Sequence, residues 1–399
     1  MKTQNRRMLL ESIIANQPVH RAQLSDLTRL NKVTVSSLVA EFSEQNLIRV
    51  LGAGESEVGR KPIMIEFNGE AGYVIGLEFA PRKLRLLCVN LAMESCHYAT
   101  FDFDSRKIAT KDDLADRLAE IIESQMARVA SAPHGLLGIG IALSGHVDQD
   151  GRRIISSHSI PWQGPDLVSQ LSERFDVPVV VDNRSNAAAL GESLFGAAKL
   201  VSSVAYVNVE EGIGVGIVLN GKIHRGFAGY AGEVCHIPLV PGGRQCTCGK
   251  YGCWDAYLNE PSILSQLNEL GIQMAPVDSD SSLQELMKEQ YCTEPGVRTV
   301  TNELGYHLGL ALVSIVHFIN PKVIVLGGRF VHLADLLMPK IESTLKEYCD
   351  PAVFDAMVLT VPSDIELAIV RGACALPMEK VFERLGALAV RADVSVEPI

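Results

Sequence analysis

The chain has 399 residues, 47% of them hydrophobic and 21% charged, which predicts two or three globular domains and excludes a disordered, collagen-like or disulfide-rich protein. Its net charge of −11 argues against a nucleic-acid binder held by bulk basicity. The charge is uneven, however, because residues 1–67 carry nine Lys and Arg against seven Asp and Glu, whereas the remainder carry 27 against 40. The first segment is therefore +2 and the rest −13, so the average does not describe the N-terminal segment.

The first segment predicts three helices. The first ends at residues 16–18, the second spans about 21–28, and the third begins after Asn31, a residue type that caps helix N-termini well. The apolar side chains recur at helical spacing, which predicts that they face a small shared core. These inward residues are Leu10, Ile13, Ile14, Leu24, Leu27, Val35, Leu38, Val39 and Phe42.

The other face of the third helix is polar, with Lys32, Thr34, Ser36, Ser37 and Glu41. Such side chains reach phosphates and base edges when a helix lies in a major groove. Strands at 47–51 and 63–67 follow, joined by a Gly-rich loop that ends in Arg60 and Lys61, cations that would lie near the minor groove. Residues 1–67 are therefore predicted to form a winged helix-turn-helix that binds DNA. The alternative is a helical oligomerisation domain with a solvated polar face, and Arg29 stands in the turn where Gly would fit more easily.

The remaining residues predict alternating strands and helices. Two strand–loop–strand units, one at 73–90 and one at 204–219, each begin a stretch of mixed strands and helices. This repetition predicts a duplicated α/β fold around a central cleft. The chain starts with no signal peptide, and its longest apolar stretch, 304–319, is interrupted by two histidines and is too short to span a membrane. We therefore expect a cytoplasmic protein.

Three short stretches carry a family resemblance: LNKVTVSS, EVGRKPIMIEFN and CTCGKYGCWDAY. With them the chain resembles the ROK family of repressors and sugar kinases over nearly its whole length, and most closely the xylose-repressor subgroup. The resemblance implies a two-lobed actin/hexokinase-like (ribonuclease H-like) domain behind the winged helix, which marks the repressor branch. We expect a first lobe at 71–195, with 379–399 packing back on it, and a second lobe at 196–378 that contains a zinc site.

Nine cysteines are present, and three of them lie within eight residues. His236, Cys246, Cys248 and Cys253 offer one imidazole and three thiolates, the closed tetrahedral set of a structural zinc, and Gly249 and Gly252 allow a tight loop. From the residues alone, redox-active or merely buried thiols remain alternatives. The pattern is similar to the family's zinc site. The other six cysteines are expected to be small core residues: Cys88, Cys96, Cys235, Cys292, Cys349 and Cys374.

The kinase machinery of the family is altered at three places. Glu78 and Ala80-Pro81 stand where the first phosphate loop has Asp and a Gly pair, and Pro81 has no N–H to donate. The second loop reads Gly212-Ile213-Gly214 without its hydroxyl, and Arg184 replaces the Asp that acts as general base. A guanidinium does not accept a proton near neutral pH, so we expect no sugar kinase activity.

Sugar recognition is better preserved. The family's sugar-binding positions correspond here to Asn183, Glu233, His236 and Asp255, and Ser159 stands where Asn is common. The alternative for each is a solvated loop residue or a helix cap. Arg184 would suit an anionic substituent, such as a 6-phosphate or a uronate, in place of the lost Asp. Equally, Arg184 would only pair with Glu78 or Asp182 and touch no ligand.

The resemblance implies a sugar-responsive transcriptional regulator, a repressor of carbohydrate-utilisation genes. It would bind a palindromic operator as a homodimer or homotetramer, and an effector sugar in the cleft would change the closure of the lobes. The alternatives are a sugar kinase with a regulatory DNA-binding head, and a regulator controlled by a protein partner.

Overall fold

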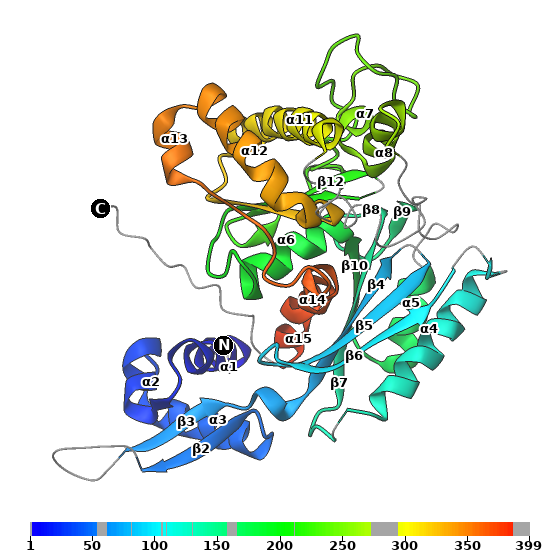
Figure 1. Cartoon of the computed structure of the whole chain (residues 1–399). Helices are drawn as coiled ribbons and strands as arrows, with labels where there is room; N and C mark the ends of the chain where they lie inside the picture. Colours follow the sequence, from blue (N-terminus) through cyan, green and yellow to red (C-terminus); the bar gives the residue numbers. More distant parts are fainter. Residues whose placement is uncertain are drawn as a thin grey trace. The chain divides into compact units, whose positions relative to one another are not determined.

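The computed structural model describes residues 2–53, 62–80, 82–104, 107–108, 110–129, 131–157, 166–210, 212–272 and 294–385 (Figure 1). The chain divides into two compact units, residues 1–183 with 370–399, and residues 184–369. Each unit is described separately below. Among the described residues, no helix is both long and apolar enough to cross a membrane.

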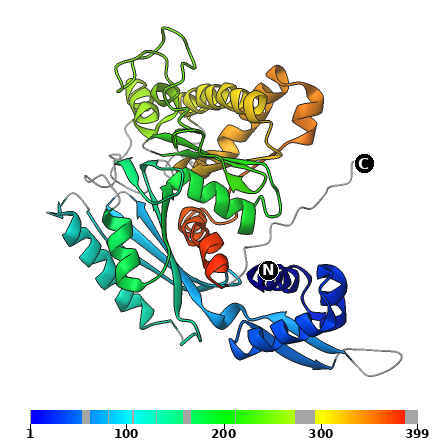
Figure 2. The same ribbon diagram turned by 180° about the vertical axis from the view of Figure 1, so that it is seen from behind.

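The N-terminal part of the first unit is a helix-turn-helix with a hairpin (Figures 1 and 2). Three helices, α1 (Lys2–Asn16), α2 (Arg21–Thr28) and α3 (Lys32–Glu44), precede the hairpin of β2 (Ile48–Ala53) and β3 (Ile63–Phe67), and a two-residue strand, β1 (Val19–His20), pairs with β3. Asn31 caps α3 by accepting a hydrogen bond from the Thr34 amide at 2.8 Å, as expected. Arg29 adopts the left-handed conformation (φ 56°) between α2 and α3, so the turn forms without glycine.

The helix-turn-helix and its hairpin, called the head below (residues 2–67), enclose a small apolar core. Eight of the nine apolar residues predicted to face inward are buried or half-buried there. Leu27 is the exception, because its side chain is 53% exposed and therefore does not face inward as expected. The strand β1 was not predicted, since two residues are too few to show a period.

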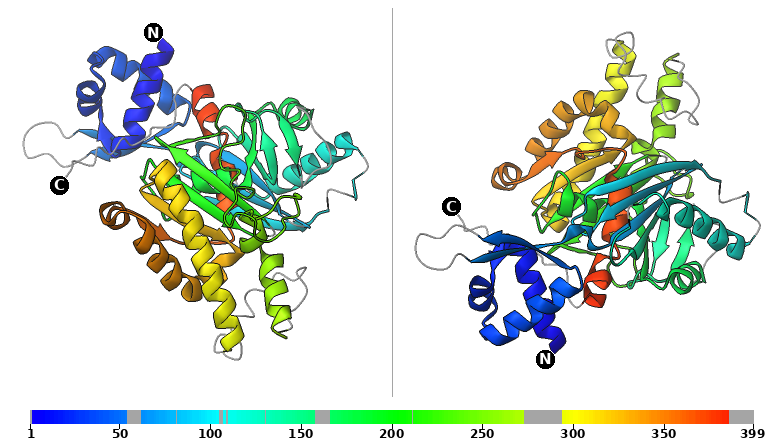
Figure 3. Two further views of the ribbon diagram at one scale, coloured as in Figure 1. Left: turned by 90° about the horizontal axis from the view of Figure 1, so that it is seen from above. Right: turned by 90° about the horizontal axis from the view of Figure 1, so that it is seen from below.

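The body of the first unit is a five-stranded sheet in the order β6-β5-β4-β7-β10. The strands are β4 (Tyr73–Ala80), β5 (Lys83–Asn90), β6 (Ser95–Asp102), β7 (Leu136–Leu143) and β10 (Val179–Asn183). The first three are antiparallel neighbours, and β4, β7 and β10 run parallel. Helices α4 (Lys111–Met126) and α5 (Asp166–Phe175) cover one face with an apolar core between (Figure 3). A short helix, η1 (Gly69–Ala71), links the head to β4, and a small ribbon of β8 (Gly145–Val147) and β9 (Ile154–Ser157) follows β7.

The opposite face of this sheet holds the C-terminal helices α14 (Ala368–Ala375) and α15 (Met378–Arg384). They approach the strands very closely, because a Cβ built on Gly140 would lie 1.8 Å from the Ala373 carbonyl oxygen and one on Gly76 would lie 2.5 Å from that of Val370. The absence of side chains at these strand positions lets α14 sit directly on the sheet.

The second unit repeats the same architecture. Its strands are β11 (Val204–Val209), β12 (Ile213–Leu219), β13 (Lys222–Ile223), β14 (Val323–Gly328) and β15 (Val358–Thr360), in the order β13-β12-β11-β14-β15. The first three are again antiparallel, and β14 and β15 run parallel to β11. Because strand order and direction match those of the first unit, the predicted duplicated fold is confirmed.

Seven helical segments accompany this sheet among the residues of the second unit that the structure describes. They are α6 (Arg184–Phe195), α7 (Asp255–Leu258), α8 (Glu260–Glu269), α11 (Pro295–Ile319), η3 (Arg329–Leu333), α12 (Ala334–Tyr348) and α13 (Pro351–Ala356). A large apolar core joins the sheet to α8, α11 and α12. Helix α6 packs on β12, where a Cβ on Gly216 would lie 1.9 Å from the Ser185 carbonyl oxygen. This packing places α6 in the second unit, so the division falls between Asn183 and Arg184 and not after residue 195 as expected. The return crossing lies between Ile369 and Val370, ahead of the expected residue 378.

Candidate functional site

A cluster of one histidine and three cysteines lies in the second unit, after β13. Ligand atoms of His236, Cys246, Cys248 and Cys253 all lie within 4.8 Å of one another. Nδ1 of His236 lies 3.7 Å from Sγ of Cys246, and Sγ of Cys248 lies 3.7 Å from Sγ of Cys253. Zinc–sulfur bonds of about 2.3 Å arranged tetrahedrally place sulfurs about 3.8 Å apart, whereas a disulfide needs about 2.05 Å. The spacing therefore fits a four-coordinate metal and excludes disulfides among these three cysteines.

The protonation of the cluster is set by its local contacts. The Lys250 amide donates to the Cys248 thiol and lowers its pKa, whereas burial raises the pKa of Cys253 to about 11. Gly249 (φ 84°) and Gly252 (φ 81°) take left-handed conformations, and a Cβ on Gly252 would lie 1.9 Å from the Val240 carbonyl oxygen. Both positions therefore favour glycine, as predicted. At Gly249 the reason is the left-handed backbone, and at Gly252 a side chain would also clash with the neighbouring carbonyl group.

Arg244 anchors this loop to the helices of the second unit. Its guanidinium donates to Glu303 on α11 at 3.0 Å and lies 4.9 Å from the ring centroid of Tyr257 on α7. The Arg244 amide also donates to the Tyr257 hydroxyl at 2.8 Å. These contacts fix the loop that carries Cys246, Cys248 and Cys253 against α7 and α11.

The cysteines outside the cluster fit the prediction in part. Cys88, Cys349 and Cys374 are buried, and burial raises the pKa of Cys235, which is half-buried, to about 12. Cys96, on the edge strand β6, is exposed, so the expectation of a core position was wrong there. Cys292 lies outside the described residues.

Three of the predicted effector-binding residues lie around the same loop. Glu233 and His236 are exposed, and Asp255 is the first residue of α7, 9% exposed. Burial raises the pKa of Asp255, and the neighbouring His236 partly offsets this effect. Because Nδ1 of His236 faces Cys246, the opposite ring nitrogen is the one directed away from the cysteines.

The other predicted effector-binding residues are placed differently. Asn183 ends β10 in the first unit, where its side-chain amide donates to the Gly145 carbonyl oxygen at 3.0 Å. Arg184 begins the second unit. Ser159 lies outside the described residues.

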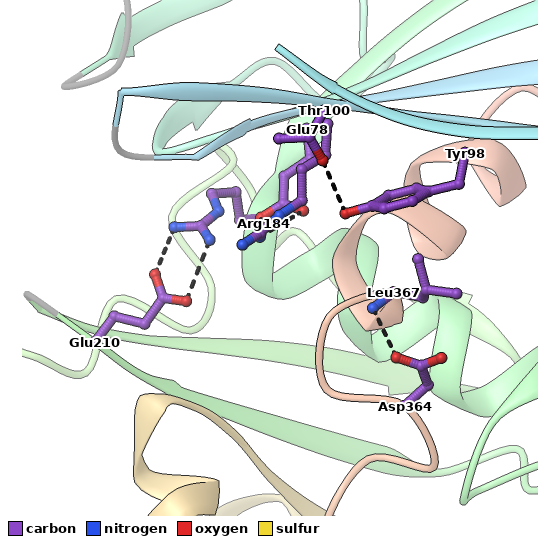
Figure 4. Close-up of polar contacts among 8 residues, drawn as sticks. Glu78, Tyr98, Thr100, Arg184, Glu210, Asp364 and Leu367 are labelled. Atoms are coloured by element: carbon purple, nitrogen blue, oxygen red, sulfur yellow. Dashed lines mark hydrogen bonds and ion pairs between the residues drawn. The ribbon is translucent and has the colours of Figure 1, made fainter. Parts of the chain in front are cut away.

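Arg184 makes a bidentate ion pair with Glu210, a partner that was not predicted (Figure 4). Nη1 of Arg184 lies 2.6 Å from Oε2 of Glu210, and Nη2 lies 3.2 Å from Oε1. The Arg184 side chain is 7% exposed and that of Glu210 is 17% exposed. The fork of the guanidinium is therefore used by a protein carboxylate, which weighs against the anionic-sugar hypothesis.

The positions of the two phosphate loops are acidic. Glu78 is fully buried in β4 and pairs with Arg85 on β5 at 3.2 Å. Glu210 follows β11, directly before the second loop, and Ile213 is buried in β12. Pro81 lies outside the described residues, whereas Ala80 ends β4.

The predicted DNA-contacting face lies at the N-terminal half of α3. Lys32, Ser36 and Ser37 are exposed and Thr34 is half-buried. Glu41 is not part of this face as expected, because it is half-buried and pairs with Arg6 of α1. Arg60 and Lys61 lie outside the described residues.

Val33 is a candidate DNA contact that sequence reasoning missed. Its side chain is 80% exposed at the second position of α3, beside Lys32. An exposed valine at the start of a helix that reads a major groove suits a thymine methyl group. The signal was present in the sequence, because Val33 falls off the apolar stripe formed by Val35, Leu38, Val39 and Phe42.

Solved structures with the same fold include both regulators and kinases. A ROK family transcriptional regulator, described as a homologue of the Escherichia coli MLC protein, superposes with a TM-score of 0.80 at 23% identity and covers 94% of this chain and 95% of its own. A ROK family glucokinase from Streptomyces griseus superposes with a TM-score of 0.62 at 23% identity and covers 76% of this chain and 99% of its own. These likenesses show that the chain shares its fold with both proteins, the regulator over 94% and the glucokinase over 76% of its length.

The ROK family model matches residues 76–380, so the chain belongs to the ROK family. The xylose repressor of Bacillus spizizenii is 32% identical over 92% of this chain and 92% of its own length. The transcriptional dual regulator NagC of Escherichia coli K12 is 27% identical over 90% of this chain and 88% of its own. Both similarities include the N-terminal head as well as the body, given the lengths that they cover.

Proposed function

We propose that this protein is a sugar-responsive DNA-binding transcriptional repressor of carbohydrate-utilisation genes. The observation that carries the proposal is the exposed polar N-terminal half of α3, at Lys32, Ser36 and Ser37, on a helix-turn-helix joined to a ROK body. Relatives named xylose repressor and NagC match the chain over nine-tenths of its length, which supports the same activity.

The α3 face and the cations Arg60 and Lys61 would contact the operator. Because residues 1–67 carry a net charge of only +2, affinity depends on paired presentation of two heads by a homodimer or a larger assembly. A palindromic operator matches such a twofold arrangement. Lys32 and Lys61 would neutralise phosphates, while Val33, Ser36 and Ser37 would read bases.

The effector is a neutral sugar in this proposal, held in the second unit by Glu233, His236 and Asp255. Carboxylate groups pair with vicinal hydroxyls, and xylose is the first sugar to test because of the names of the relatives. Arg184 supports the site through Glu210 and does not bind an anion, since its fork is already used by that carboxylate.

The cluster of His236, Cys246, Cys248 and Cys253 would hold a structural zinc ion. Four protein ligands and no open position suit a structural role and not a catalytic one. The metal would fix the orientation of His236, whose second ring nitrogen then faces the effector.

The chain is not a sugar kinase in this proposal. Ala80-Pro81 stands where the first phosphate loop of the kinases has a Gly pair, and Arg184, which is paired with Glu210, replaces the general base. Transfer of phosphate from ATP to any hexose, faster than by Arg184→Ala, would contradict this part of the proposal.

The test is selection of DNA by the full-length protein. Genomic fragments of the source organism are enriched on the purified protein, and the selected fragment is then titrated in a mobility-shift assay with xylose, glucose and N-acetylglucosamine. We expect a palindromic site upstream of sugar-utilisation genes and release of that site by one neutral sugar. Enrichment of no sequence would refute DNA recognition, and a selected site insensitive to every sugar would favour control by a protein partner.

A further inference from the structure

Arg6 of α1 joins the recognition helix α3 to the last turn of α15. Its guanidinium donates from Nε and Nη2 to the Leu385 carbonyl oxygen, each at 3.3 Å. The same group donates to Glu41 on α3 and to Gln45 just after it, and lies 4.9 Å from the ring centroid of Phe42. The Arg6 side chain, 15% exposed, thus contacts both α3 and a residue 379 positions further along the chain.

Further contacts fix the same end of α3 to the body of the first unit. Nε2 of His134, in the loop before β7, lies 2.7 Å from the Gln45 carbonyl oxygen. Asn68, which follows the hairpin, donates from its side chain to the Asn46 carbonyl oxygen at 2.7 Å. The side chains of Arg6, His134 and Asn68 therefore all bind at the C-terminal end of α3, whereas the polar N-terminal half of α3 is exposed.

Helix α15 packs closely against other elements of the first unit. Phe382 packs against Phe67 of β3 with ring centroids 6.2 Å apart, and a Cβ on Gly138 of β7 would lie 2.8 Å from the Val381 side chain. Arg384 donates to the Asp176 carboxylate at 2.9 Å. The chain enters the first unit at Val370, within α14, so α14 carries the crossing from the second unit and α15 is the next element after it.

We propose that Arg6 and α15 form a coupling device that transmits the state of the ROK body to the recognition helix. A displacement of α14 and α15 at the crossing moves the Leu385 carbonyl oxygen, and Arg6 passes this movement to Glu41, Phe42 and Gln45. The regulatory meaning of the device rests on the proposed function, but the mechanical link from α15 to α3 does not. A purely structural clamp is the competing interpretation, in which each end is stabilised locally and nothing passes between them.

Amide hydrogen exchange on the full-length protein tests the link. The variants are Arg6→Met, Phe382→Leu, the double variant and, as a matched control, Arg7→Met, whose side chain pairs only within α1 with Glu11. The readouts are the amides that close the end of α3, those of Gln45 and Leu47, and the Leu385 amide, which closes α15 by donating to Val381. Zinc content and far-ultraviolet circular dichroism verify that each variant is folded.

We expect Arg6→Met to accelerate exchange at both ends at least tenfold, and Phe382→Leu to accelerate exchange at the end of α3 although it does not touch Arg6. The double variant should exceed the larger single effect by less than twofold, and Arg7→Met should change neither end. If Phe382→Leu leaves Gln45 and Leu47 unchanged, the structural clamp is correct and the coupling is refuted. This outcome remains readable if Arg6→Met fails to fold.

Operator affinity provides the second arm. With the DNA site selected as above, Arg6→Met should weaken binding at least fivefold and Arg7→Met less than twofold, although neither residue lies on the exposed face of α3. Equal effects of the two variants would contradict the coupling. If the wild-type protein selects no DNA, the proposed function fails, and the exchange measurements still decide whether α15 and α3 are linked.

Discussion

The ion pair between Arg184 and Glu210 should contribute strongly to the stability of the second unit, and its two members should be interdependent. Both side chains are largely buried, and the geometry is bidentate at 2.6 and 3.2 Å. Two unit charges about 4 Å apart interact by about 4 kcal/mol at an effective dielectric constant near 20. Removal of one partner also leaves a buried charge without its main counter-ion, at a typical cost of about 3–5 kcal/mol.

We therefore expect Arg184→Met alone to lower the free energy of unfolding by about 3 kcal/mol, and Glu210→Gln alone by about 2–3 kcal/mol. The double variant should lie within about 1 kcal/mol of the wild type, because two neutral side chains need no counter-ion. The coupling energy obtained from this cycle is about 4 kcal/mol.

Urea unfolding followed by tryptophan fluorescence measures these differences. The chain has two tryptophans, and in a Trp162→Phe background the buried Trp254 reports on the second unit alone. Zinc is kept saturating, so that metal loss does not change the transition. Single effects that add to the double effect within about 0.5 kcal/mol would refute the reasoning, because they would show that the two charges do not interact.

Three further predictions concern the metal, the DNA face and pH. Cys248→Ser should lose the one zinc ion per chain that the wild type retains, as measured by atomic absorption, and its free energy of unfolding in urea should fall by several kcal/mol. Cys235→Ser, which changes a cysteine outside the cluster, should retain the zinc ion. Lys32→Ala should weaken binding to all DNA sequences and reduce the slope of the logarithm of the binding constant against the logarithm of salt concentration by about 1. Ser37→Ala should weaken binding to the selected site only, by about 1–3 kcal/mol of binding free energy. Burial lowers the pKa of His307 in the folded protein, so the unfolded chain binds the proton more tightly. The free energy of unfolding should therefore be at its full value above pH 6.5 and fall as the pH drops below it. His307→Phe should remove this decrease at acid pH.

Each of these has an outcome that would contradict it. Equal zinc content in the Cys248 and Cys235 variants would place the metal elsewhere. Identical losses on random and selected DNA for Lys32→Ala and Ser37→Ala would show that neither side chain reads bases. A wild-type stability that does not change between pH 6.5 and 5 would show that His307 is solvated more than its packing indicates.

The spacing of apolar residues along the sequence was sufficient to predict several of the helices and strands that position the candidate sites. The second helix was predicted at its observed bounds, Arg21–Thr28, and the two strand–loop–strand units predicted at 73–90 and 204–219 correspond to β4–β5 and β11–β12. The exposed edge strand β6 was missed, because its inward side chains are few and its sequence, Ser95–Asp102, lacks a run of β-branched residues. Leu27 shows the opposite error, since a leucine on a short helix was expected to be buried and is 53% exposed.

The metal cluster was predictable in full and the ion pair was not. Three cysteines within eight residues are brought together by one loop, so their spacing along the chain predicts that they lie close together, and the resemblance to the family's zinc site favoured a metal over the alternatives. Arg184 and Glu210 belong to different elements, separated by β11, and only the fold brings them into contact. Arg6 and Leu385 offered no clue, because backbone carbonyl groups leave no trace in a sequence pattern.

The two crossovers that join the third and fourth strands differ greatly in length. In the first unit this connection runs from Asp102 to Leu136 and contains a single long helix, whereas in the second it runs from Ile223 to Val323. The longer connection contains the four residues of the metal cluster. A metal site allows such a connection to fold around an ion while the sheet behind it stays unchanged. Acquired specificity in this lineage is therefore expected to concentrate in the second crossover, which makes it the segment to exchange when effector response is redesigned.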